Sequence, residues 1–132
     1  MDNIHRTRAM FNDMLNLPRG KYVPVGVAAG GSISFARGAF AVSYDRDLLP
    51  IPGCGVYDGL PDMDLILDAE RRKGWQAGTE IALGDLYLKD TPFGLCPRGI
   101  LKNAIKNWVD MGYNPMIGIE TEAYVFQRDE DG

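Results

Sequence analysis

Apolar residues recur at helical spacing over residues 97–112, and this is the clearest regular pattern in the chain. The apolar side chains share one face of the expected helix: Leu101, Ala104, Ile105, Trp108 and Val109. Polar side chains fill the opposite face: Lys102, Asn103, Lys106 and Asn107. Pro97 suits the first turn of a helix, and Gly112 suits the position just after its end. The pattern therefore predicts an amphipathic helix.

Shorter apolar runs elsewhere predict β-strands. Residues 21–27 are rich in valine and follow a turn at residues 17–20, so a hairpin is expected there. Residues 32–44 also read as extended chain. Residues 81–88 form an apolar run interrupted by Asp85, which fits a strand. With one clear helix, these strands predict an α+β fold built on a small mixed sheet.

Two parts of the chain leave alternatives open. Residues 4–15 fit either a helix or a strand over residues 7–12, because apolar spacing alone permits both. Residues 53–64 contain three glycines and a proline, so a loop is expected, yet its acidic stretch lacks the offsets of a calcium-binding EF-hand. Asp58 and Asp62 in this loop either accept hydrogen bonds from nearby backbone amides or serve a binding function.

Strict alternation over residues 117–126 predicts a further strand, buried because both of its faces carry large apolar groups. A period of two places Glu120 and Glu122 on the same face of that strand. Two buried carboxylates require a compensating cation, and Mg²⁺ or Mn²⁺ prefers such oxygen ligands. The alternative is that both carboxylates face water or pair with Lys and Arg.

Size and charge narrow the range of functions. A chain of 132 residues that is 45% hydrophobic has enough apolar material for one main core. Its net charge of −4, without a basic cluster, argues against nucleic acid or an anionic membrane as a partner. Two isolated cysteines and a charged N-terminal segment indicate a cytoplasmic protein without a signal peptide. His5 is the only histidine, which excludes a catalytic triad within the chain.

Four motifs, taken in order, resemble the glutamine synthetase family. They are Phe11-Asn12-Asp13 with Pro18-Arg19-Gly20-Lys21-Tyr22-Val23-Pro24; Tyr57-Asp58-Gly59 with Asp62-Met63 and Asp68; Pro97-Arg98-Gly99-Ile100-Leu101-Lys102-Asn103-Ala104; and Gly118-Ile119-Glu120-Thr121-Glu122-Ala123-Tyr124-Val125-Phe126. The Arg-Gly-Lys turn is similar to the bacterial subgroup of γ-glutamyl-polyamine and γ-glutamylmethylamide ligases. The sequence departs from the family pattern at Leu60-Pro61, which leaves the acceptor amine open.

The resemblance implies a β-grasp-like mixed sheet over residues 1–95, followed over residues 96–132 by the first helix and strand of the family's catalytic domain. It favours a strand over residues 7–12. It also implies that this sequence ends before the remaining metal ligands and the nucleotide-binding residues, so that the segment alone is inactive.

The activity implied by the resemblance is an ATP-dependent ligase that joins glutamate to ammonia or a small amine through a γ-glutamyl phosphate. Glu120 is then expected to bind the divalent metal that holds the nucleotide phosphates, and Glu122 the metal that holds the substrate carboxylate. Asp58 is expected to face a neighbouring subunit's active site in a homo-oligomeric ring and to bind ammonium or the amine. The alternative is a non-catalytic β-grasp-like binding or assembly module.

Overall fold

The computed structural model describes residues 3–129, so the outer limits of the two expected units, residues 1 and 132, lie outside the described residues. In chain order, the elements are β1 (Arg6–Asn12), β2 (Pro18–Pro24), α1 (Val25–Ala28), β3 (Ser32–Ala36), the 3₁₀ helices η1 (Arg37–Phe40) and η2 (Val56–Asp58), β4 (Asp62–Leu67), β5 (Arg72–Lys73), β6 (Thr79–Leu88), β7 (Thr91–Pro92) and α2 (Pro97–Asp110).

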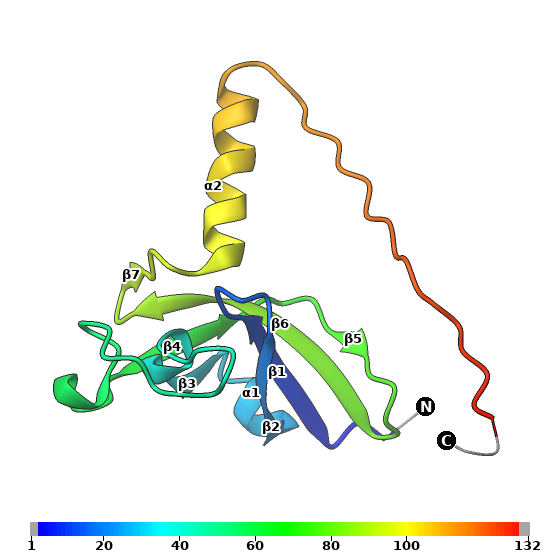
Figure 1. Cartoon of the computed structure of the whole chain (residues 1–132), viewed down its shortest axis with the longest axis horizontal. Coiled ribbons are helices and arrows are strands. Elements are labelled where there is room, and N and C mark those ends of the chain that lie inside the picture. Colours follow the sequence, from blue (N-terminus) through cyan, green and yellow to red (C-terminus); the bar gives the residue numbers. More distant parts are fainter. Residues whose placement is uncertain (1–2, 130–132) are drawn as a thin grey trace.

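The strands form one curled mixed sheet in the order β2-β1-β6-β4-β3, with β5 and β7 paired to β6 (Figure 1). β1 pairs with β2 as an antiparallel hairpin and runs parallel to β6, whereas β4 is antiparallel to both β6 and β3. The long strand β6 therefore joins the two halves of the sheet. The α+β fold expected from the sequence is confirmed.

The ambiguous N-terminal segment is a strand, and the helical alternative is wrong. In β1, Thr7, Ala9 and Phe11 are buried while the residues between them are more exposed. This period of two fits a sheet with one face on the core. Because β1 lies between β2 and β6, both of its edges are hydrogen-bonded, which a helix at this place would forfeit.

Four phenylalanine rings hold the centre of the core together. The ring of Phe11 lies 5.0 Å from that of Phe35 and 6.0 Å from that of Phe40, and Phe93 lies 5.0 Å from Phe40. Two of these contacts are edge-to-face, an arrangement that aromatic rings favour. Residues from β1, β3, η1 and the segment before α2 thereby share one core.

Helix α2 matches its prediction closely. It runs from Pro97 to Asp110 and ends at Gly112, whose φ of +85° is the left-handed conformation that glycine adopts easily. The amide of Gly112 donates to the carbonyl of Val109, and that of Tyr113 donates to the carbonyl of Trp108. These two bonds form a Schellman cap. The helix projects away from the sheet, and none of its residues is buried (Figure 1).

Three strand predictions need correction. The strand expected over residues 117–126 is not formed: residues 113–129 run as an extended segment without secondary structure, exposed except at the half-buried Pro115 (Figure 1). A strand needs a partner for its backbone groups, and none of the strands described in residues 3–129 pairs with this one. The expectation that it is buried is wrong too, since Ile119 and Val125 are more than nine-tenths exposed.

The other two corrections concern boundaries. Residues 21–27 are split, because β2 stops at Pro24 and the helical turn α1 follows. Residues 32–44 contain only the short strand β3 before the chain turns into η1. A proline lacks the backbone N–H that a continuing strand requires, which explains the stop at Pro24. Among residues 3–129, no helix combines the length and apolar content needed to cross a bilayer.

Candidate functional site

The acidic loop is organised by the side chain of Asp58. Its Oδ2 atom accepts hydrogen bonds from the backbone amides of Gly53 at 2.9 Å and Gly55 at 3.2 Å. The chain leaves this turn through Gly59, whose φ of +79° is left-handed. Asp58 thus accepts hydrogen bonds from nearby backbone amides, which is one of the two alternatives expected from the sequence. It is nevertheless exposed to solvent.

The rest of the loop departs from the prediction. Asp62 does not bind a nearby amide; its Oδ2 accepts a hydrogen bond from the hydroxyl of Ser34 at 3.0 Å, and it opens strand β4. Arg37 donates from Nη1 to the carbonyl of Gly53 at 3.2 Å and from Nε to that of Asp62 at 3.0 Å. Cys54, in the same loop, is buried, so the loop is held both by Arg37 and by the burial of this side chain.

Glu120 and Glu122 lie in the exposed segment that follows α2. The rings of Tyr124 and Phe126 in this segment are 6.2 Å apart, so side chains two positions apart share a side there. The extended backbone therefore keeps the alternation that the sequence predicted, without the flanking strands.

The structure does not bring the three predicted site residues together. The loop of Asp58 (teal to green) and the segment of Glu120 and Glu122 (orange to red) lie at opposite sides of the molecule in Figure 1. Within the described part of the chain, no three His, Cys, Asp or Glu side chains gather as a metal site. Two exposed carboxylates nevertheless fit part of a Mg²⁺ or Mn²⁺ ligand set, which often takes its other oxygens from phosphate and water.

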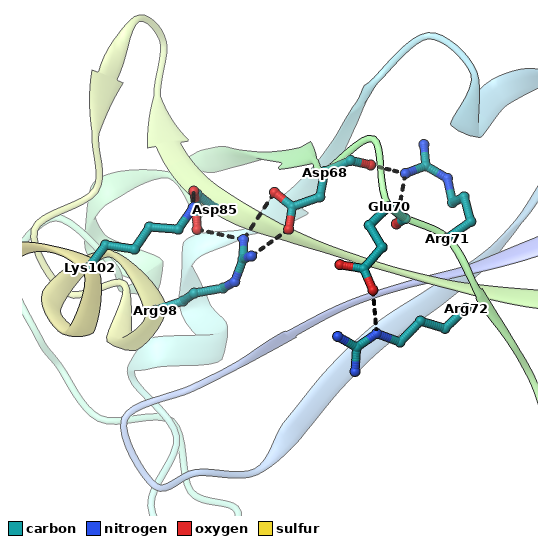
Figure 2. Close-up of polar contacts among 7 residues, drawn as sticks. All are labelled: Asp68, Glu70, Arg71, Arg72, Asp85, Arg98 and Lys102. Carbon is teal, nitrogen blue, oxygen red and sulfur yellow. Dashed lines mark hydrogen bonds and ion pairs between the residues drawn. The ribbon is translucent and has the colours of Figure 1, made fainter. Parts of the chain in front are cut away.

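A different polar cluster is assembled where α2 meets the sheet (Figure 2). Arg98, in the first turn of α2, donates from Nη1 to Asp68 Oδ1 at 3.1 Å and from Nη2 to Asp68 Oδ2. The same Nη1 atom lies 2.9 Å from Oδ1 of Asp85 in β6. Lys102, one helical turn further along, binds Oδ2 of Asp85. We call these four residues the α2 joint.

Charge in the α2 joint is balanced, with two cations facing two carboxylates. The hydrogen bond from Arg98 holds the pKa of Asp68 below its usual value, against the opposing effect of partial burial. The same bond raises the pKa of Arg98, again against partial burial. Both groups therefore stay ionised across the neutral range.

The residues of the α2 joint are recognisable in the sequence one by one, but their connection is not. Asp68 and Arg98 stood in two separate motifs, and Asp85 appeared only as the polar interruption of an apolar run. That interruption was the available signal, because a charge inside a strand needs a partner. The partner itself, 13 residues away on a helix, was not readable from local spacing.

Comparison with known proteins gives relatives of one kind, although no family model matches the chain. A γ-glutamylanilide synthase from an Acinetobacter species is 31% identical over 134 residues, covering 89% of this chain and 27% of that protein. The glutamine synthetase of Pyrococcus abyssi is 29% identical over 123 residues, covering 90% of this chain and 25% of that protein. This chain thus spans about one quarter of the length of these curated relatives.

Solved structures agree in fold. A crystal structure described as a novel glutamine synthase homolog superposes with a TM-score of 0.65 at 17% identity, covering 84% of this chain and 28% of that one. A complex of GmaS with ADP gives a TM-score of 0.62 at 22% identity, covering 83% and 24%. Over about nine-tenths of its length this chain is therefore a homologue of glutamine synthetase-type proteins, of which it spans about one quarter, and it shares their fold.

Proposed function

We propose that this chain is the N-terminal portion of an ATP-dependent ligase that joins glutamate to ammonia or a small amine. The observation that carries the proposal is the 31% identity to a γ-glutamylanilide synthase over 89% of the chain. In this proposal residues 1–95 form the β-grasp-like unit and residues 96–132 begin the catalytic domain. The enzyme is cytoplasmic and works as a homo-oligomeric ring.

The proposed reaction has two displacements. An oxygen of the glutamate γ-carboxylate attacks the γ-phosphorus of ATP, ADP leaves, and a γ-glutamyl phosphate forms. The nitrogen of ammonia or the amine then attacks the acyl carbon, the C–O bond to phosphate breaks, and nitrogen loses a proton to give the amide. The protein contributes chiefly by orienting the reactants and stabilising charge.

Glu120 is proposed to bind the divalent ion at the nucleotide phosphates, and Glu122 the ion at the substrate carboxylate. When bound, such ions neutralise charge on the transferring phosphoryl group. Support comes from the exposed carboxylates and the extended backbone, which gives two residues at this spacing a common side. Their remaining coordination positions are left for substrate oxygens and water.

Asp58 is proposed to bind the ammonium or protonated amine at a neighbouring subunit's site and to help remove its proton. Its anchoring supports this role, because the two backbone amides on Oδ2 hold the carboxylate in one orientation. Among the contacts of residues 3–129, Oδ1 receives no hydrogen bond, which leaves an acceptor for a cation.

The test measures ADP release by the full-length protein that contains this chain, with glutamate and a panel of ammonia and amines. Release that requires both glutamate and an amine is expected. Glu120→Gln and Glu122→Gln should each lower metal affinity or activity at least about ten-fold. Asp58→Asn should raise the KM for the amine more than the KM for glutamate. Asp129→Asn is the matched control for the two glutamate-to-glutamine variants, because it changes an exposed carboxylate in the same segment. Asp47→Asn is the control for Asp58→Asn, because it changes an exposed carboxylate in a neighbouring loop.

Absence of glutamate-dependent ADP release for every amine would overturn the proposal and favour the non-catalytic module. If Glu120→Gln and Glu122→Gln keep the same metal affinity and activity as Asp129→Asn, only the metal assignment is overturned. Size-exclusion chromatography with light scattering measures the mass of the full-length protein in solution. A mass of several subunits is expected for a homo-oligomeric ring, and the mass of one subunit would contradict it.

A further inference from the structure

We propose that the α2 joint, made of Asp68, Asp85, Arg98 and Lys102, sets the direction in which helix α2 leaves the sheet. This inference concerns the conformation of the chain and is independent of the ligase proposal. The direction of α2 also affects where the segment with Glu120 and Glu122 lies, because that segment directly follows the helix.

The first support is the lack of apolar anchoring along α2. None of its 14 residues is buried, and its large apolar side chains, such as Leu101 and Trp108, are each about half exposed. Burial begins just before the helix, at Phe93 and Cys96. A helix in a small domain ordinarily obtains its stability from packing of one apolar face. Here that source is missing, so contacts at the helix base decide its direction.

The second support is the geometry of the joint itself. Arg98 engages both oxygens of Asp68 and one of Asp85, and Lys102 engages the other oxygen of Asp85. A planar guanidinium held by two carboxylates in this manner fixes orientation as well as distance. Lys102 lies one turn beyond Arg98, so the helix is held at two points along its axis.

The third support is that one carboxylate lies on β6 and the other directly follows β4, the strand paired with β6. Ile66 of β4 lies opposite Asp85 of β6, and Asp68 follows the end of β4, where its amide donates to the carbonyl of Leu83 at 2.8 Å. The acceptors therefore belong to the rigid sheet. The donors belong to the helix, so the joint connects one body to the other (Figure 2).

The fourth support is space beside the helix base. A cavity of about 310 Å³ lies between β1, β6 and the first turns of α2, with Met10, Leu83, Pro97 and Leu101 in its lining. Close packing does not hold the helix on this side. Loss of the ion pairs would therefore allow the helix to tilt.

The experiment measures a distance across the joint in the 132-residue chain. Spin labels are placed at Met14→Cys, in the turn after β1, and at Met111→Cys, at the far end of α2. Both positions are more than half exposed, whereas the native Cys54 and Cys96 are buried, so labelling is selective. Fourteen helical residues form a lever of about 21 Å, so a tilt of about 15° moves the far end by about 5 Å.

The parent chain is expected to give one narrow distance distribution. Arg98→Met should shift or broaden the distribution of distances between the two labels by about 5 Å, because a tilt of about 15° moves the far end of the helix by that much. Arg98→Lys should give a smaller change, because an ammonium keeps the charge but not the paired geometry. Lys106→Met is the matched control: it removes an exposed ion pair with Asp110 on the same helix and should leave the distribution unchanged.

An unchanged distribution in a folded Arg98→Met variant would overturn the inference, as would an equal change in Lys106→Met. If Arg98→Met does not fold, Asp85→Asn takes its place, since that variant keeps the Asp68 pair. A broadened distribution for Asp85→Asn then supports the joint, and an unchanged one overturns it. Circular dichroism checks that each variant is folded. No outcome bears on ADP release, so the two proposals fail separately.

Discussion

Arg98 and Asp68 are 30 residues apart in sequence and face each other with two guanidinium nitrogens on two carboxylate oxygens. The contact joins two motifs that were separate in the sequence, one at the end of β4 and one at the start of α2. Each side chain is about one-third exposed, so solvent screens the interaction only in part.

The pH dependence of stability should reveal this contact. Because Arg98 lowers the pKa of Asp68 from its usual 3.8, the folded chain binds this proton less readily than the unfolded chain. The stabilisation is complete well above 3.8 and is lost as the pH falls through the lower folded value. Urea denaturation should show the parent about 1 kcal/mol more stable than Asp68→Asn near neutral pH, a figure discounted for exposure. A difference that stays constant down to acid pH would contradict this reading.

Asp13 should matter more for stability than any exposed carboxylate. Its side chain is 2% exposed; Oδ1 accepts the amides of Leu15 and Leu17, and Oδ2 binds Arg19. Asp13→Ala would leave these donors without their acceptor in the hairpin turn, at a cost of about 2–4 kcal/mol. Chemical denaturation measures the loss. Asp90→Ala, in the exposed turn after β6, is the control and should change stability by less than about 0.5 kcal/mol.

Gly84 should tolerate no side chain. A Cβ atom there would lie 2.2 Å from the carbonyl oxygen of Ile66 and 3.0 Å from Leu65 Cδ1, so β4 and β6 would have to separate. Gly84→Ala is expected to cost about 1–3 kcal/mol, the range typical of overpacking. Gly94→Ala is the control, because nothing lies within 4 Å of its Cβ position. Similar melting temperatures for the two variants would show that the strands yield easily.

Some of the fold follows from local sequence. The limits of α2 were predictable because Pro97 and Gly112 act within a turn of the helix they bound. Strand β6 (Thr79–Leu88) was predictable from the apolar run over residues 81–88, which only Asp85 interrupts. The family resemblance also rested on short motifs, and the comparisons support it. The roles of Asp58, Glu120 and Glu122 stay predictions.

The remaining features depended on contacts between distant residues. Residues 4–15 fitted helix or strand equally, and pairing with β6, more than 60 residues later, decided for a strand. Residues 117–126 carried a strand pattern, yet a strand forms only where another strand completes its hydrogen bonds. The α2 joint likewise required Asp68 and Asp85 to meet one helix. Spacing and capping act over a few residues and are readable in sequence, whereas sheet ladders and ion pairs exist only once the chain has brought their partners together.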